Sequence, residues 1–445
     1  MSNEVKAIFE PKSVVLVGAS DRVREGIVSP AFFHSLVHNM HRFFKGKIHV
    51  VDLSGKLEGA IKNLNRVPRG RDLAVVVLPP KLVMKNWRNL LNLVIKAIVL
   101  VAGGFDQQQR EKLARGVAKR KVCILGPNAT AGVINTSNGL CATLERGFMP
   151  SRGGIAVISQ DSAVGMAILD WARFHGVGVG KFASTGDSVD VTEADLLEFL
   201  MHDKETKVIC IYLQTVRDGR RFLGLIREAV RKKPVVVMKG GTAQDERDKI
   251  FAASLKQVGA IRVGIVEELL GVADALAKQP PMPGDRVAVV TNVDGAATLV
   301  ADALSRKGFA LAKLSDKVTK KITRKYQDIN IVEWVDLGIG AKDDRYKFVL
   351  EQVLSDHGVD GVVVINELEL SFLEPEDVQA IAEVAEKSND KPIVSVTVAG
   401  GAGVLVREAV KGKNVPVYDS PEKAVRALDA LRSYWKTRTK VEKGV

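Results

Sequence analysis

Short, nearly continuous apolar runs alternate with amphipathic stretches along the whole chain. In the first third, these runs cover residues 13–19, 47–52, 73–79, 96–103 and 121–127. Runs without polar alternation are typical of parallel strands that are covered on both faces. The stretch 107–120 has a helical pattern, with Leu113 and Val117 on one face. Strand–helix alternation with short Gly and Pro turns predicts a doubly wound, Rossmann-like α/β domain with a parallel sheet over residues 1–150.

The same alternation recurs in two further segments, which we expect to be separate α/β units. Residues 151–280 hold apolar runs at 154–159, 207–213 and 234–240, and Thr192 with Asp195 forms a capping-box pattern before a helix. The segment 279-QPPMPG-284 predicts a stiff linker, because three of four successive residues are proline. Residues 281–445 hold the third unit, in which we expect a last helix over about 421–436 and a basic tail that frays.

The composition, 46% hydrophobic and 26% charged, supports folded cores and excludes wholesale disorder. No apolar run approaches the ~18 residues of a membrane span, and the N-terminus lacks the pattern of a secretory signal. Cys123, Cys141 and Cys210 are widely spaced and form neither a metal-ligand pattern nor a disulfide framework. These features predict a cytoplasmic protein without a membrane partner.

The charge is distributed unevenly. The net charge is +13, and residues 1–150 carry 23 basic against 10 acidic residues, whereas residues 281–445 carry 24 against 25. Such an asymmetry favours a polyanionic partner for the first third. The candidate contacts form clusters: Arg42, Lys45, Lys47, Arg66, Arg69, Arg71, Arg115, Lys119 and Arg120. Because no RNA-binding motif is present, this inference is electrostatic and carries no sequence specificity.

Several strand-to-helix turns are candidates for ligand binding. Gly18-Ala19-Ser20 follows the first run, where a doubly wound domain binds phosphates, but the dinucleotide fingerprint is incomplete. Asp52 stands where a ribose-binding acid would lie, yet the glycine loop does not fit a nicotinamide cofactor. Turns of this kind also occur at Ser159-Gln160-Asp161 and at Asn292-Val293-Asp294-Gly295. We expect Asp161 and Asp294 to cap the helices that follow.

Metal and nucleophile motifs are scarce. His34, His38 and His41 can share one helix face, but no Cys or fixed carboxylate accompanies them, so we expect no metal site. The sequence has no G-x-S-x-G elbow, no H-E-x-x-H and no C-x-x-C.

In its order of motifs the chain resembles the α subunit of NDP-forming (ADP-forming) acyl-CoA synthetases of the archaeal type. The resemblance covers SVVLVGAS, VVVLPP, VAGGF, ILGPN, GGIAVISQDSAVGMAILDWA, PVVVMKGG and RVAVVTNVDGAATLVADAL. It implies a CoA-binding domain followed by two flavodoxin-like, succinyl-CoA-synthetase-like domains. It also implies that CoA would lie against Gly18, Ala19, Ser20, Pro79, Gly103 and Asn128.

The resemblance further implies the reaction acyl-CoA + ADP + phosphate giving acid + CoA + ATP, in which a histidine carries the phosphoryl group. The family's SHTGSLAG segment, which holds this histidine, is missing here, and no His occurs between His202 and His357. Gln214 replaces the family's glutamate that steadies the phosphohistidine. The family's phosphate loops SQSG and NAGGPG are altered and now carry Asp161 and Asp294. A covalent relay needs its nucleophile, so we expect no phosphoryl transfer.

Three functions therefore stay open. The first is a non-catalytic homologue of the synthetase α subunit that binds CoA, acyl-CoA or another polyanion. The second is an RNA- or ribosome-associated protein that reuses the synthetase fold, and the third is an active synthetase subunit. No cofactor follows with certainty and CoA is the one candidate, and the candidate protein partners are a synthetase β-type subunit or a second copy of the chain.

Overall fold

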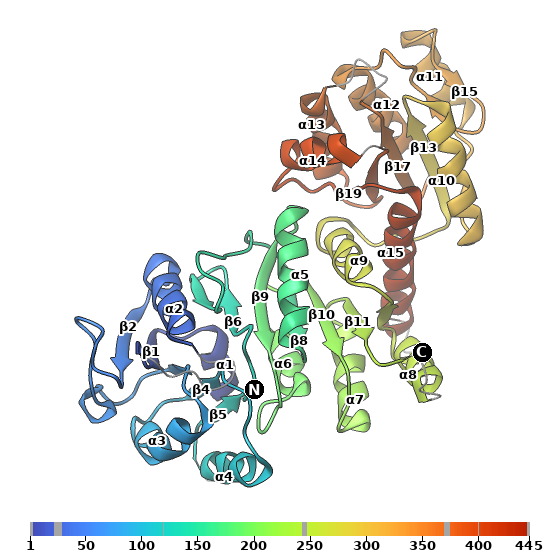
Figure 1. Cartoon of the computed structure of the whole chain (residues 1–445). Coiled ribbons are helices and arrows are strands. Elements are labelled where there is room, and N and C mark those ends of the chain that lie inside the picture. Colours follow the sequence, from blue (N-terminus) through green and yellow to red (C-terminus); the bar gives the residue numbers. More distant parts are fainter. Residues whose placement is uncertain are drawn as a thin grey trace. The chain divides into compact units, whose positions relative to one another are not determined.

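The computed structural model describes residues 3–21, 29–118, 120–242, 247–368, 374–398 and 400–442 (Figure 1). The chain forms two compact units. One comprises Met1–Arg173 with Gly178–Ser254, and the other comprises Phe174–Val177 with Leu255–Val445. The α/β fold class that the alternating pattern predicted is confirmed in both units. Within the described residues, every helix is too short or too polar to cross a membrane.

The first sheet has five parallel strands in the order β2-β1-β3-β4-β5. The strands are β1 (Ser13–Gly18), β2 (Lys47–Asp52), β3 (Leu73–Val76), β4 (Ala97–Leu100) and β5 (Cys123–Leu125). The connecting elements are α2 (Pro30–Phe43), η1 (Leu64–Arg66), α3 (Pro80–Asn92) and α4 (Gln107–Ala118), and α1 (Asn3–Phe9) precedes the sheet. Every residue of β1, β3, β4 and β5 is buried, as expected for strands covered on both faces.

The strand order places a topological switch point between β1 and β3. The chain leaves β1 toward β2 on one side and returns to β3 on the other side. In open α/β sheets, ligands bind beyond the carboxyl ends of the strands at such a point. The turn after β1 and the turn after β3 both lie there.

The second sheet of the first unit has the order β11-β10-β8-β9-β6-β7. Its strands are β6 (Val133–Asn135), β7 (Leu140–Ala142), β8 (Ile155–Ser159), β9 (Val179–Ser184), β10 (Val208–Leu213) and β11 (Val235–Lys239). Its helices are α5 (Ser162–Phe174), α6 (Glu193–Leu200) and α7 (Gly219–Val230). The β6–β7 hairpin is antiparallel and pairs with β9, although it precedes residue 151 in the sequence. The predicted capping box of Thr192 and Asp195 is present at the start of α6.

The second unit is built on the sheet β15-β16-β13-β17-β18-β19, and β14 also pairs with β13. Its strands are β13 (Arg286–Thr291), β14 (Ala310–Leu311), β15 (Asn330–Ile331), β16 (Val335–Asp336), β17 (Gly361–Asn366), β18 (Ile393–Thr397) and β19 (Val417–Tyr418). The unit also contains β12 (Ile261–Val263), which is not a strand of this sheet. The helices are α9 (Val266–Lys278), α10 (Asp294–Arg306), α11 (Asp316–Lys325), α12 (Asp343–Ser355), η2 (Pro375–Val378), α13 (Gln379–Lys387), α14 (Gly400–Ala409) and α15 (Pro421–Glu442), and α8 (Arg247–Val258) spans the division between the units.

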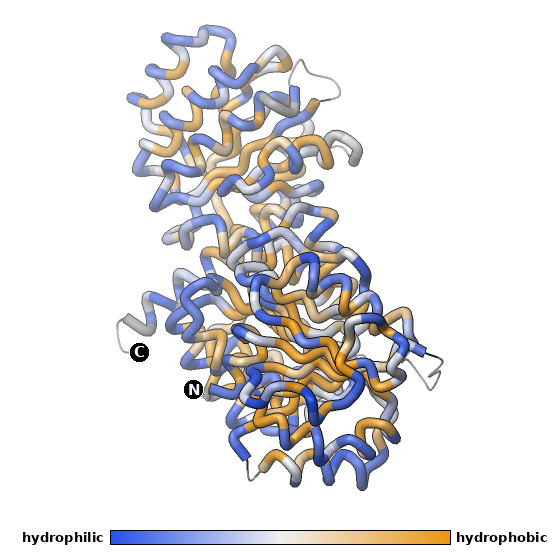
Figure 2. Tube along the Cα trace, turned by 90° about the vertical axis from the view of Figure 1, so that its left-hand side faces the viewer, coloured by the Kyte–Doolittle hydropathy of each residue, from blue (hydrophilic) through white to orange (hydrophobic). Residues whose placement is uncertain are grey.

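Apolar residues of β13, β17 and β18 alternate between two cores, one on each face of this sheet. Figure 2 shows the hydrophobic positions gathered along the strands and the hydrophilic ones along the outer helices. The last helix is longer than predicted, since α15 continues to Glu442 instead of ending near residue 436. Buried Leu428, Leu431 and Tyr434 anchor it, and the predicted helix end near residue 436 is therefore too early.

Candidate ligand-binding site

The turn after β1 is fixed by the carboxylate of Asp52, at the end of β2. Asp52 is fully buried. It accepts hydrogen bonds from the backbone N–H and the hydroxyl of Ser20, at 2.8 and 2.6 Å. Further hydrogen bonds come from Ser54, Lys56 and Leu57. Burial alone would raise the pKa of Asp52, but these hydrogen bonds hold it well below its ordinary value. Asp52 therefore organises the turn, and its oxygens are not available to a ribose.

Gly18 is required by packing. A Cβ at this position would lie 2.1 Å from the ring of Phe33, which α2 places over the end of β1. Ala19 is buried, and Ser20 is partly exposed. Pro79 ends the segment after β3 and is the N-cap residue of α3. The structure thus places these four residues at the switch point.

Gly103 and Asn128 lie in direct proximity beyond the ends of β4 and β5. A Cβ on Gly103 would lie 2.7 Å from Oδ1 of Asn128, and the Asn128 N–H donates to the carbonyl of Ala102 at 2.8 Å. Asn128 has a φ of 63°, in the left-handed region that Asn tolerates better than most residues. All six predicted CoA contacts therefore lie along one carboxyl edge of the first sheet.

The turn between β8 and α5 joins this edge. The Ser162 hydroxyl donates to the carbonyl of Asn128 at 3.2 Å and is hydrogen-bonded to the Ser184 hydroxyl at 2.8 Å. The Ser159 hydroxyl donates to the Asp161 carbonyl at 2.6 Å. Asp161 accepts the Val164 N–H at 2.9 Å and so caps α5, as expected. The cap leaves fewer N–H groups of the helix start for an anion.

The Gln160 side chain joins its own turn to the loop that follows β10. The Gln160 side-chain oxygen accepts the N–H groups of Gln214 and Thr215, at 2.6 and 3.0 Å, and its amide donates to the Thr215 carbonyl. The Gln214 amide donates to the Tyr212 hydroxyl at 3.4 Å. The two turns are thus tied together by the neutral amide of Gln160, and neither the Gln160 nor the Gln214 side chain can act as a base.

Two polar atoms near this edge were not predicted from the sequence. The hydroxyl of Thr185, which follows β9, is buried without a hydrogen-bond partner, and so is Nε of Arg110. The Arg110 guanidinium also contacts Asp187 at 3.3 Å. Unsatisfied buried polar groups are few in folded proteins. No local sequence motif could have located these two atoms, because they come together only where loops that are distant in the sequence lie close in space.

The second unit carries the other altered turn, after β13. Asn292 is buried, and its side chain exchanges hydrogen bonds with the backbone of Glu367, at 2.8 and 3.0 Å. The prediction that Asp294 caps α10 is wrong. Asp294 is the first residue of that helix, and its carboxylate accepts the Trp334 indole N–H at 2.6 Å. A Cβ on Gly295 would meet open space.

The predicted polyanion contacts lie largely on the opposite edge of the first sheet. Lys47 begins β2, Arg71 precedes β3 and Arg120 precedes β5, so these residues mark the amino ends of the strands. Arg71 is half-buried, whereas the remaining described members are exposed: Arg42, Lys45, Lys47, Arg66, Arg69, Arg115 and Arg120. Lys119 lies outside the described residues. In the described part of the chain, no His, Cys, Asp and Glu cluster fits a metal ion, and this includes the region of His34, His38 and His41.

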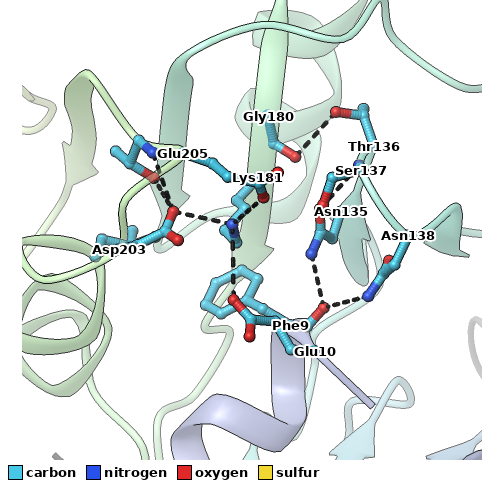
Figure 3. Close-up of polar contacts among 12 residues, drawn as sticks. Phe9, Glu10, Asn135, Thr136, Ser137, Asn138, Gly180, Lys181, Asp203 and Glu205 are labelled. Atoms are coloured by element: carbon cyan, nitrogen blue, oxygen red, sulfur yellow. Dashed lines mark hydrogen bonds and ion pairs between the residues drawn. The ribbon is translucent and has the colours of Figure 1, made fainter. Parts of the chain in front are cut away.

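A buried lysine, not predicted from the sequence, ties α1 to the second sheet (Figure 3). Only 1% of the Lys181 side chain is exposed, and its ammonium contacts Asp203 at 2.9 Å and Glu205 at 3.1 Å. Glu10, just after α1, lies 3.9 Å away. The carbonyl of Phe9 accepts both Asn135 and Asn138, each at 3.0 Å. An open pocket of about 560 Å³ lies beside this cluster, and its lining includes Glu10, Asn135, Asn138, Asp203 and Glu205.

Comparison with known proteins agrees with the motif order. Residues 152–276 match the family described as succinyl-CoA ligase like flavodoxin domain. The chain is 29% identical to the acetate–CoA ligase [ADP-forming] I subunit alpha of Pyrococcus furiosus, over 98% of this chain and 99% of the relative. It is 30% identical to the acetate–CoA ligase [ADP-forming] I of Archaeoglobus fulgidus, over 98% of this chain but 64% of the relative.

Solved structures give the same result. A protein from Pyrococcus horikoshii superposes with a TM-score of 0.88 at 27% identity and covers 98% of this chain and 99% of its own. The dinucleotide-forming acetyl-coenzyme A synthetase 1 of Ca. Korarchaeum cryptofilum, in complex with phosphate and ADP, superposes with a TM-score of 0.86 at 26% identity, over 99% of both chains. The resemblance drawn from the motifs and the predicted fold class are confirmed.

Proposed function

From the homology of this chain, over nearly its whole length, to α subunits of ADP-forming acyl-CoA synthetases, we propose that it binds CoA or an acyl-CoA without transferring a phosphoryl group. The site is the carboxyl edge of the first sheet. The observation that carries the proposal is the convergence of four strand ends with the β8–α5 turn at Asn128. N–H groups at helix starts beyond these strand ends favour the phosphates of such a ligand.

The absence of phosphoryl transfer is inferred from the residues that remain. A phosphoryl relay through histidine needs a histidine, and the sequence has none between His202 and His357. At the position of the family's glutamate, Gln214 is a neutral amide that cannot hold an imidazolium by charge. Asp161 places a carboxylate at the helix start where an anion would bind, and like charges at such distances repel.

Calorimetry with CoA tests the binding site. We expect wild type to bind CoA and Gly103→Ala to bind about tenfold more weakly, because the added methyl displaces the Asn128 side chain and removes roughly one hydrogen bond. Gly224→Ala is the matched control, since a Cβ at Gly224 meets nothing within 4 Å. The absence of CoA binding by wild type at millimolar ligand rejects the proposal. Equal binding by Gly103→Ala and wild type rejects this location.

The exposed amino-edge basic residues favour a second candidate, an RNA- or ribosome-associated role. A CoA at the carboxyl edge does not neutralise charges at the amino ends of the strands. Purification of the full chain from native lysate distinguishes the candidates. Nuclease-sensitive nucleic acid that remains bound supports the second, and retained CoA or acyl-CoA supports the first.

A further inference from the structure

The second unit carries a cationic surface that its overall charge does not predict. Residues 281–445 are close to neutral, with 24 basic and 25 acidic residues. Helix α11 nevertheless presents five successive cations on one face, all exposed: Lys317, Lys320, Lys321, Arg324 and Lys325. Their spacing of three, four, seven and eight residues confines them to an arc of about 140° around the helix. We call this set the α11 cationic face.

The opposite side of α11 is fixed to the protein. Val318 is 7% exposed and Ile322 is fully buried in the core beneath the helix. Lys325 lies over the rings of Phe348 and Tyr326, at 4.0 and 5.1 Å from their centroids. The helix is therefore held with its cations outward, around a surface hollow of about 520 Å³.

The charges of this face are not neutralised by the protein. In the part of the chain that the structure describes, Lys317, Lys320, Lys321 and Arg324 form no ion pair. Elsewhere in the same unit, exposed cations do find carboxylates, as Lys347 does with Glu383 at 2.7 Å. Like charges at helical i, i+4 spacing, as in Lys317 with Lys321 and Lys320 with Arg324, destabilise an isolated helix, and a bound polyanion would relieve this repulsion.

We propose that the α11 cationic face binds the phosphate backbone of a nucleic acid. Lys317 and Lys325 are separated by about 12 Å along the helix, the length of roughly three phosphates of one strand. Membrane insertion is disfavoured, because the apolar side chains Val318 and Ile322 are buried within the unit. A protein partner is disfavoured, because interface cores are depleted in lysine whereas phosphate contacts are made by Lys and Arg. The proposal does not depend on the CoA site.

The test is the affinity of the full chain for a labelled single-stranded RNA of 20 nucleotides, with duplex DNA of equal length as a second probe, between 50 and 200 mM salt. The variant Lys317→Glu/Lys321→Glu/Arg324→Glu removes three phosphate contacts. We expect its affinity at 50 mM salt to fall at least tenfold and its log–log salt slope for RNA to become shallower by about 2.

The control variant Lys307→Glu/Lys387→Glu/Lys436→Glu makes the same change in net charge at exposed lysines of the second unit that lie outside the face. It separates a local contact from a general loss of positive charge. Equal affinity and slope for the two variants overturn the proposal, and so does an absence of binding by wild type at 50 mM salt. If the glutamate variant does not fold, the corresponding glutamine variant is measured in its place. We expect its log–log salt slope for RNA to become shallower by a similar amount, because the same three phosphate contacts are lost.

Discussion

At the scale of single residues, Asp52 illustrates how a carboxylate can resemble a ligand-binding group and serve the fold. We predict that Asp52→Asn lowers the free energy of unfolding by about 2–4 kcal/mol at pH 7, because an amide has one acceptor oxygen for several buried donors. The donors include Ser20, Ser54 and Leu57. Urea unfolding of both proteins measures the difference.

The pH dependence gives an independent check of the same residue. The pKa of Asp52 is lower in the folded protein than its ordinary value of about 3.9. Its stabilising contribution is therefore complete above that pH and is lost as the pH falls through the lower folded value. The difference between wild type and Asp52→Asn should shrink below about pH 4. A difference that stays constant from pH 7 to pH 3 contradicts this account.

The positions of site residues were predictable where a residue directly follows an apolar run that forms a strand. The turns at Gly18, Asp161 and Asn128 follow apolar runs, so the sequence locates them at strand ends. The partner of a side chain was less predictable. Asp294 has the residue type of a cap, but Trp334, 40 residues away, supplies its hydrogen bond. Likewise, the requirement for Gly18 comes from Phe33, which local propensity cannot reveal.

At the scale of elements, Lys181 connects α1 to β9 and to the loop before β10 (Figure 3). We predict that Lys181→Met lowers the free energy of unfolding of the full chain by about 3–5 kcal/mol, because one partner of a buried ion pair is removed and Asp203 stays buried. Lys112→Met, at an exposed position of α4, is the matched control and should change stability by less than about 0.5 kcal/mol.

The loss should depend on pH. Burial alone would raise the pKa of Asp203. Hydrogen bonds from Thr206 and Lys181 outweigh this effect, so the pKa of Asp203 lies below its ordinary value. The contribution of the pair is thus present at neutral pH and fades as the pH falls below about 4. Denaturant unfolding at pH 7 and at pH 3.5 measures this. An equal loss at both pH values points to lost packing of the lysine stem instead of lost charge.

Elements themselves were largely predictable, because buried parallel strands leave continuous apolar runs. β1, β8, β10, β13 and β17 all coincide with such runs. The β6–β7 hairpin was missed, since its strands of three residues each are too short for a periodic signal. α15 extends beyond its predicted end although Tyr434 is its last buried residue, and half-buried Trp435, Thr437 and Thr439 line the continuing turns.

At the scale of the whole molecule, the net charge of a segment does not reveal how charged residues are distributed over its surface. The excess of +13 belongs to the first third of the chain, and this led to the amino-edge candidates. The near-neutral last third hides the α11 cationic face, because acidic residues elsewhere in that third balance its charge. A charge count over a segment cannot detect a surface that only the helical period assembles.

The remaining whole-molecule prediction concerns the reaction of the relatives. We predict that the full chain, mixed with the β subunit of an active relative, acyl-CoA, ADP and phosphate, forms no ATP above a no-enzyme control. The reason is the absence of a histidine between His202 and His357. Gln214→Glu should remain equally inactive, because a carboxylate alone supplies no phosphoryl carrier. The active relative's own α subunit is the positive control for the assay. ATP formation by this chain well above the no-enzyme control, at a rate proportional to its concentration, would show that another residue carries the phosphoryl group and would make it an active synthetase subunit.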